Sequence, residues 1–238
     1  MTPETAGQAL DVAVARSGSV DGKSLEWLAA VTEAAGGSST ALMAAAARAR
    51  QAPCTVVLVE GMSDQAAVRT LAARRGRDLP GEGVFVVPMG GATNTAHFLG
   101  LFGPNGFGVR LAGLCDEAEE PGFRRGLERA GLGSTGLAAA PFDLAALGFF
   151  VCVADLEDEL IRSLGTGRVE RLIAAQGELA MFQTFVKQPA HRDAPREQQL
   201  HRFMGTRSGR KIRYGHLLAA AVDPGQVPGP LAGLLAWM

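Results

Sequence analysis

The sequence has few cysteines, no long apolar run and little net charge, and each shortage excludes a class of protein. Its three cysteines, Cys54, Cys115 and Cys152, lie in or beside apolar runs and lack the spacing of a metal site. We therefore expect reduced core thiols rather than disulfides. No apolar run reaches the roughly 20 residues that a membrane span needs, and acidic and basic residues interrupt the N-terminus where a secretory signal would be apolar. The sequence predicts a cytoplasmic protein without a membrane partner.

The net charge of −1 and the pI of about 6.4 provide no global basic field for nucleic acid. The charge is nevertheless uneven, because residues 187–216 contain eight arginines and lysines against two acids. A phosphodiester backbone is bound by such donors, arginine through paired contacts and lysine as a point charge. We predict phosphate contacts from Arg202, Arg207, Arg210 and Arg213.

Several catalytic devices are also missing. No Gly-x-x-x-x-Gly-Lys-Ser/Thr run occurs, so we expect no ATP site. The single tyrosine, Tyr214, lies beside a basic run rather than in a recognisable motif, which argues against a tyrosine nucleophile. The four histidines have no mutual metal spacing. We interpret them as structural or surface residues, with His191 or His201 at most contacting a phosphate.

One stretch, residues 55–64, organises the rest of the chain. Residues 56–59 form the apolar, β-branched run that is typical of a buried parallel strand. The run ends in Glu60-Gly61, and Ser63 is predicted to cap a helix with Asp64 in its first turn. Glu60 and Asp64 would then lie where open α/β sheets bind ligands and could hold a cation. Alternatively, Glu60 is a solvated loop residue and Asp64 complements the helix dipole.

Further apolar runs predict strands at 84–88, 109–114 and 147–153, and helices at 96–102 and 122–129 separate them. Strands and helices in alternation indicate a mainly parallel sheet.

Residues 1–52 read as short helices. We interpret them as a packing or dimerisation element rather than a helix-turn-helix DNA reader, because they lack a basic recognition helix.

A second group of acids follows the last predicted strand, where four of the five residues 155–159 are acidic. If a helix begins at Asp155, then Asp155, Asp158 and Glu159 share one face. Like charges on one face cost stability unless a cation neutralises them. The alternative is an acid-rich first turn that the helix dipole favours, although this explains one or two acids better than four.

The segment Val59–Asp64, placed after an apolar strand, resembles the opening motif of a Toprim domain. An aspartate four residues after the glutamate most resembles the OLD (overcoming lysogenization defect) branch. Toprim domains carry a second motif, Asp-x-Asp, after a later strand. Asp116 matches its first position, but the second is Ala118, and Glu117 or Glu119 could stand in for the missing acid.

The resemblance implies a Rossmann-like α/β Toprim fold, with helical additions at both ends, and a metal-dependent endonuclease that hydrolyses DNA. It implies one or two Mg²⁺ or Mn²⁺ ions, held by Glu60, Asp64, Asp116, Asp155 and Glu159. The residues expected to bind metal or to support its ligands are Ser63, Glu117, Glu119, Glu157 and Asp158. In OLD-type regions a lysine follows the acidic motifs, and Lys211 is the candidate here, with Arg210 and Arg213 as competitors. Lys211 would act beside Glu60, Asp64 and Asp116 in catalysis.

The resemblance covers about residues 54–238, and the helical segment (1–52) lies outside it. We expect this segment to be followed by a Toprim domain (53–154) and a helical region that completes the site (155–238). OLD proteins carry an ATPase module before the Toprim domain, so any ATP-driven step here would need a separate ATPase partner. A homodimer is compatible with the sequence.

DNA is the expected substrate, and RNA stays open. Two other functions also stay open. A non-catalytic, regulatory nucleic-acid-binding module would explain Ala118, and a small-molecule phosphohydrolase or nucleotidyl transferase would suit the low net charge.

Overall fold

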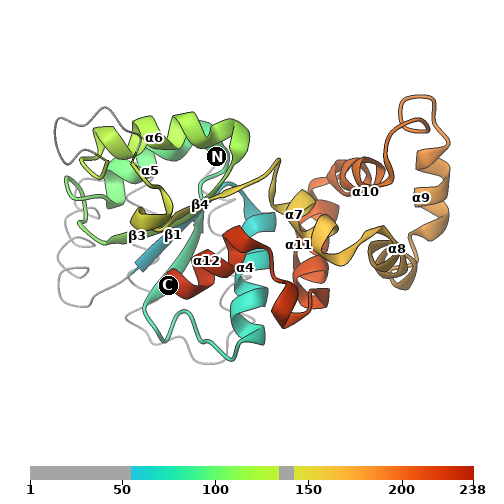
Figure 1. Ribbon diagram of the computed structural model, residues 1–238, viewed down its shortest axis with the longest axis horizontal. Coiled ribbons are helices and arrows are strands. Elements are labelled where there is room, and N and C mark those ends of the chain that lie inside the picture. Colours follow the sequence, from blue (N-terminus) through green and yellow to red (C-terminus); the bar gives the residue numbers. More distant parts are fainter. Residues whose placement is uncertain (1–54, 134–141) are drawn as a thin grey trace.

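A computed structural model of the chain describes residues 55–133 and 142–238. Its centre is a four-stranded parallel sheet in the order β2-β1-β3-β4 (Figure 1). The strands are β1 (Thr55–Val59), β2 (Val84–Pro88), β3 (Arg110–Asp116) and β4 (Phe149–Cys152). The predicted α/β fold is confirmed. The predicted N-terminal segment 1–52 and Cys54 lie outside the described residues.

Helices connect these strands and cover both faces of the sheet (Figure 1). They are α4 (Met62–Arg74), η1 (Ala92–Asn94), α5 (Thr95–Phe102), η2 (Glu117–Glu119), α6 (Glu120–Arg129) and η3 (Ala145–Leu147). The α5 and α6 helices pack together on one face, and α4 lies on the other.

The alternation of side chains along β1 divides the interior into two cores. Val57 and Val59 point into the core beneath α4, whereas Val56 and Leu58 point into the core beneath α5 and α6, and all four are fully buried. A strand with apolar residues on both faces must be covered on both sides. This explains why the run is continuous rather than alternating.

The chain after β4 forms further helices: α7 (Leu156–Leu164), α8 (Thr166–Ala175), α9 (Leu179–Val186), α10 (Arg196–Gly205), α11 (Ser208–Ala221), η4 (Pro224–Gln226) and α12 (Gly229–Trp237). The α8, α9 and α10 helices project away from the sheet, while α12 returns to pack on β3 and β4 (Figure 1). The core beneath α4 continues into these helices through Phe182, Phe203 and Tyr214. In the described part of the chain, no helix has both the length and the apolar character to cross a bilayer.

Both helices that follow the acidic motifs begin differently from the expectation. Gly61, not Ser63, is the N-cap of α4, because the Asp64 side chain accepts the Gly61 amide and closes the first turn earlier. Ser63 is instead buried inside the helix. Asp155 is the N-cap of α7 rather than its first residue. This one-residue change decides which acids turn toward the sheet.

Candidate metal centre at the strand ends

The first three predicted carboxylates lie at the ends of the neighbouring strands β1 and β3 and in the first turn of α4, which follows β1. Glu60 directly follows β1, and its carbonyl oxygen accepts the amides of Gly90 and Gly91 at 3.0 and 3.2 Å, which holds its backbone against the loop after β2. Asp64 lies in the first turn of α4, where its Oδ2 accepts the Gly61 amide at 2.7 Å. Asp116 ends β3, the strand beside β1. Because parallel strands end at one edge of a sheet, these side chains meet there.

The charges of these carboxylates act on one another. Burial, with added repulsion from Asp155, Glu60 and Asp64, raises the pKa of Asp116 to about 8. Burial and the charge of Glu157 raise the pKa of Asp64 to about 7, although the Gly61 amide and Lys211 oppose the shift. A raised carboxyl pKa means that the protein provides too few donors or cations for the charged form.

Asp155 brings a fourth carboxylate from the start of α7. Its Oδ1 caps the helix by accepting the Asp158 amide at 2.8 Å, and its Oδ2 lies 2.5 Å from Nε2 of His201 on α10. Burial raises the pKa of Asp155, but the bonds from His201 and Asp158 more than offset this and hold it below the usual value. Hydrogen bonding to Asp155 in turn raises the pKa of His201.

Glu157 is the most deeply buried acid of the site, with 1% of its surface exposed. Neither of its carboxylate oxygens accepts a well-formed hydrogen bond from the described residues. Lys211 Nζ lies 3.4 Å from its Oε2. Burial raises the pKa of Glu157, and Lys211 and the Ser63 hydroxyl only partly oppose this. Lys211 itself is half-buried, and Glu157, Asp64 and Asp155 raise its pKa against the effect of burial.

The other two acids of α7 face a different partner. Asp158 and Glu159 both pair with Arg162 one turn later on the same helix, and Glu159 also accepts the Val153 amide at 2.9 Å. Asp155 and Glu157 therefore turn toward the other carboxylates, whereas Asp158 and Glu159 share the guanidinium of Arg162.

Of the two acids that flank Ala118, Glu119 has the environment of a ligand. Its Oε2 is buried and accepts no hydrogen bond from the described residues. Burial and the charge of Glu60 raise its pKa. Glu117 is exposed to solvent.

Close packing of α11 on α4 places Lys211 in the site. A Cβ atom on Gly215 would lie 2.7 Å from the carbonyl oxygen of Ser63, so only glycine allows the two backbones to approach this closely. Lys211 is four residues before Gly215 and shares its face of α11. The contact at Gly215 therefore sets how far Lys211 reaches toward Glu157.

The four predicted phosphate contacts have different environments. Arg202 and Arg207 are exposed. Arg210 is buried, donates to Glu178 at 3.2 Å and lies over the Phe203 ring. Arg213 is half-exposed and pairs with the same Glu178 at 2.7 Å. Arg210 is thus bound internally, away from solvent.

The donor set fits a divalent cation. Buried carboxylate oxygens without a hydrogen-bond partner, at Glu157 and Glu119, are hard ligands of the kind that Mg²⁺ and Mn²⁺ take. Five carboxylates, from Glu60, Asp64, Asp116, Asp155 and Glu157, act on one another around the ammonium of Lys211. A cation would relieve this excess of negative charge.

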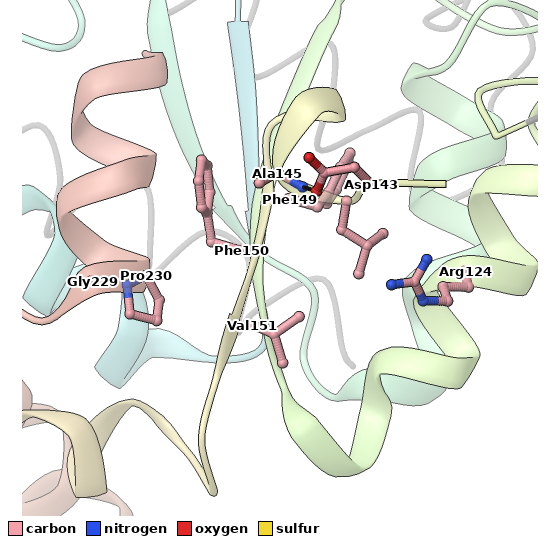
Figure 2. Close-up of a pocket in the computed structure, with 9 residues that line it drawn as sticks. Arg124, Asp143, Ala145, Phe149, Phe150, Val151, Gly229 and Pro230 are labelled. Atoms are coloured by element: carbon pink, nitrogen blue, oxygen red, sulfur yellow. Dashed lines mark hydrogen bonds between the residues drawn. The ribbon is translucent and has the colours of Figure 1, made fainter. Parts of the chain in front are cut away.

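A pocket lies elsewhere, along edge strand β4 between α6 and α12 (Figure 2). It is lined by Arg124, Asp143, Leu144, Ala145, Phe149, Phe150, Val151, Gly229 and Pro230. None of the predicted site residues lines it. The chemistry of the candidate site therefore lies at the strand ends, outside this pocket.

The sequence predicts at most a phosphate contact for His201. It places Glu157 only among the residues that bind metal or support its ligands. His201 lies 46 positions beyond Asp155 and meets it only because α10 packs against α7. No spacing rule covers such a contact. The orientation of Glu157 depends on which residue is the N-cap of α7, and the run of acids in the sequence does not show which residue that is.

Comparisons with known proteins agree with this fold. Residues 54–117 match the family model for the Toprim domain of overcoming lysogenization defect protein-like proteins. The C-terminal region of the Xanthomonas campestris pv. campestris OLD protein is 25% identical with a TM-score of 0.56, over 76% of this chain and 92% of that one. The corresponding Burkholderia pseudomallei region is 22% identical with a TM-score of 0.56, over 78% and 96%. No curated protein matched the sequence. Residues 54–117 are therefore similar to the Toprim domain of OLD-like proteins, and the chain shares the fold of an OLD C-terminal region.

Proposed function

We propose that this protein is a Mg²⁺- or Mn²⁺-dependent endonuclease that hydrolyses DNA phosphodiester bonds at the strand ends. One observation carries the proposal: the carboxylates of Glu60, Asp64, Asp116, Asp155 and the buried Glu157 act on one another beside the ammonium of Lys211, and burial together with this repulsion raises the pKa values of Asp64 and Asp116. Stability alone gives no reason to gather such charges. The Toprim domain of OLD-like proteins supports the assignment, since this domain is generally a metal-binding nuclease fold.

Each carboxylate has a role in this proposal. The metal ligands would be Glu60, Asp64, Asp116, Asp155 and Glu157, with Glu159 held back by Arg162. When bound there, one or two ions would supply an activated water and stabilise the leaving oxygen. Lys211 would place its ammonium beside the scissile phosphate and stabilise the charge that develops on it. Glu157 would hold Lys211 in place through their ion pair.

Glu119 would take the place of the acid that Ala118 lacks. The strand ends at Asp116, and the chain continues as the 3₁₀ turn η2. The charge of Glu119 contributes to the raised pKa of Asp116, and the charge of Glu60 contributes to the raised pKa of Glu119, so the Glu119 carboxylate lies near both acids. In an extended strand, residue 118 would share the side of Asp116 instead. The acid would therefore be displaced by one position rather than lost.

DNA would reach the site across the exposed arginines of the C-terminal helices. Arg202 and Arg207 are exposed, and Arg213 keeps part of its guanidinium in solvent. Arg210 is left out because its guanidinium is buried against Glu178 and Phe203. Such contacts would provide affinity that falls steeply with salt, without sequence preference.

Ala118 favours one other function, a nucleic-acid-binding module without catalysis. Incubating supercoiled plasmid with the wild type in EDTA, Mg²⁺ or Mn²⁺ separates the two. Nicking or linearisation that needs the metal, disappears in Glu60→Gln and persists in the exposed control Glu117→Gln would support the nuclease.

Salt-sensitive binding without cleavage in any metal would reject the nuclease and leave the binding module. Parallel incubations with RNA and with mononucleotides would identify a different phosphate substrate.

A further inference from the structure

His201 lies in the site, although the sequence predicts at most a phosphate contact for it. Its Nε2 is 2.5 Å from Oδ2 of Asp155. One donor atom each from Asp155, Glu157 and His201 lie within 4.8 Å of one another. Two ligands on opposite sides of one ion are about 4.2 Å apart when each bond is about 2.1 Å. A modest rotation of these side chains would therefore bring all three donors onto one ion.

Glu157 shows that this group is more than a cluster of surface acids. The side chain is 1% exposed, and its two oxygens accept no well-formed hydrogen bond from the described residues. Leaving a buried charged group without partners is costly. Lys211 approaches Oε2 to 3.4 Å, which balances part of the charge and leaves Oε1 for another partner.

The contact between His201 and Asp155 does not account for Glu157. If His201 served only to orient Asp155, the pair would satisfy itself and Glu157 would remain buried, with Lys211 and the Ser63 hydroxyl only partly opposing the effect of burial on its charge. An ion shared by all three residues satisfies the carboxylates together. The His201 side chain is 36% exposed, so the ion also has a path from solvent.

We infer that His201 is a metal ligand and that Asp155, Glu157 and His201 bind a first-row transition ion of the Mn²⁺ class in preference to Mg²⁺ or Ca²⁺. The reason is the imidazole nitrogen, because Mg²⁺ and Ca²⁺ take oxygen ligands whereas transition ions accept nitrogen as well. The inference rests on the proposed function in that it assigns this position to the same metal-dependent site. The inference also separates two sets of ligands. Glu60, Asp116 and Glu119 offer oxygen alone, whereas Asp155 and Glu157 are joined by the nitrogen of His201.

The test uses Mn²⁺ as a spectroscopic probe on the full chain. Pulsed electron paramagnetic resonance detects nitrogen bound to Mn²⁺ through the modulation that ¹⁴N imposes on the electron spin echo. We expect an imidazole signal in the wild type and its loss in His201→Gln. His216, which contacts Thr70 at 2.7 Å, provides the matched control, and His216→Gln should keep the signal.

A binding titration provides a second readout. His201→Gln should weaken Mn²⁺ binding by at least about 10-fold and leave Mg²⁺ binding nearly unchanged. Mn²⁺ binding without a nitrogen signal would overturn the inference while leaving the metal site of the proposed function intact. A wild type that binds Mg²⁺ but no Mn²⁺ would overturn the inference alone, and one that binds neither ion would reject both.

Discussion

Helix α11 lies between two groups of acids that are arranged in opposite ways. On one side, a single carboxylate, Glu178, receives bonds from Arg210, Arg213 and the Tyr214 hydroxyl. These donors hold the pKa of Glu178 below its usual value, although burial alone would raise it. On the other side, several carboxylates share the ammonium of Lys211, and the pKa values of Asp64 and Asp116 are raised.

The difference indicates that one group stabilises the fold and that the other is suited to bind a cation. An acid that stabilises the fold is surrounded by donors, because an unmatched buried charge costs more than its packing contributes. Acids gathered beyond the available donors destabilise the metal-free protein and are suited to bind a cation. Residues 210–214 of α11 serve both groups, so the satisfied group can fix the position of the lysine in the unsatisfied one. The predictions below test this contrast.

The largest effect should come from Lys211→Met, which removes the only ammonium among the carboxylates that the structure describes. We expect plasmid cleavage to slow by about 10²–10³-fold, as when one preorganised group that stabilises the transition state is lost. The measurement is the nicking rate at saturating metal. The matched control is Lys187→Met, at an exposed lysine of the same basic stretch. Equal losses in the two variants would show that Lys211 acts only through general charge.

Glu178→Gln tests the satisfied group. The change removes the charge that three donors share, and we expect the free energy of unfolding to fall by about 1.5–3 kcal/mol. Urea unfolding measures the loss. As a control, Glu170→Gln neutralises a half-exposed acid that pairs with Arg196. It should lower the free energy of unfolding by less than about 1 kcal/mol.

The same variant has a pH signature. Because the folded pKa of Glu178 lies below its unfolded value, its stabilisation is complete at neutral pH and is lost as pH falls through the folded pKa. The difference in stability between wild type and Glu178→Gln should therefore shrink in acid. A difference that stays constant with pH would show that packing, not charge, is responsible.

Glu119→Gln and Glu117→Gln test which acid replaces Ala118. The first should weaken Mn²⁺ binding by about 10-fold, since its buried oxygen faces Glu60, and the second should leave binding unchanged. Isothermal titration calorimetry compares the two. A larger loss of Mn²⁺ affinity in Glu117→Gln than in Glu119→Gln would contradict the role of Glu119 and assign it to Glu117.

The smallest effect, with the opposite sign from Glu178→Gln, is expected for Asp116→Asn. Removing one repelled charge should raise the stability of the metal-free protein by about 0.5–2 kcal/mol at pH 9. The folded pKa of Asp116 is about 8, above its ordinary 3.8, so the wild type takes up a proton and gains stability as pH falls between these values. Part of the pH dependence should disappear in the variant. Urea unfolding in EDTA at pH 5 and pH 9 measures both effects.

Much of the fold could be predicted, because local patterns specify it. The run of valines and leucine at 56–59 needs cover on both faces, and the alternation of strands and helices then requires a parallel sheet. The edge where Glu60, Asp64 and Asp116 would meet follows from the same reasoning. The predicted strand 84–88 agrees with β2, and the other predicted strands differ from the observed ones by one or two residues at their ends.

The rest of the site depends on choices that the sequence does not encode locally. Whether Asp155 caps α7 or begins it decides whether Glu157 or Glu159 turns toward the sheet. The approach of His201 depends on how α10 packs, and the fate of Arg210 depends on Glu178, 32 positions away. A stretch rich in arginine predicts phosphate contacts, but it does not show which guanidinium is already bound to an acid.

The most direct measurement is the thermal unfolding midpoint of the initially metal-free protein as Mn²⁺ is added, compared between the wild type and two variants. If the acids at the strand ends bind the ion, the wild type should be stabilised by about 2.7 kcal/mol once Mn²⁺ exceeds its dissociation constant 100-fold. Glu178→Gln should start lower and rise equally, whereas an Asp64→Asn, Asp116→Asn double variant should start higher and rise little. A wild-type midpoint that does not respond to Mn²⁺, or an equal rise in the double variant, would contradict the metal centre.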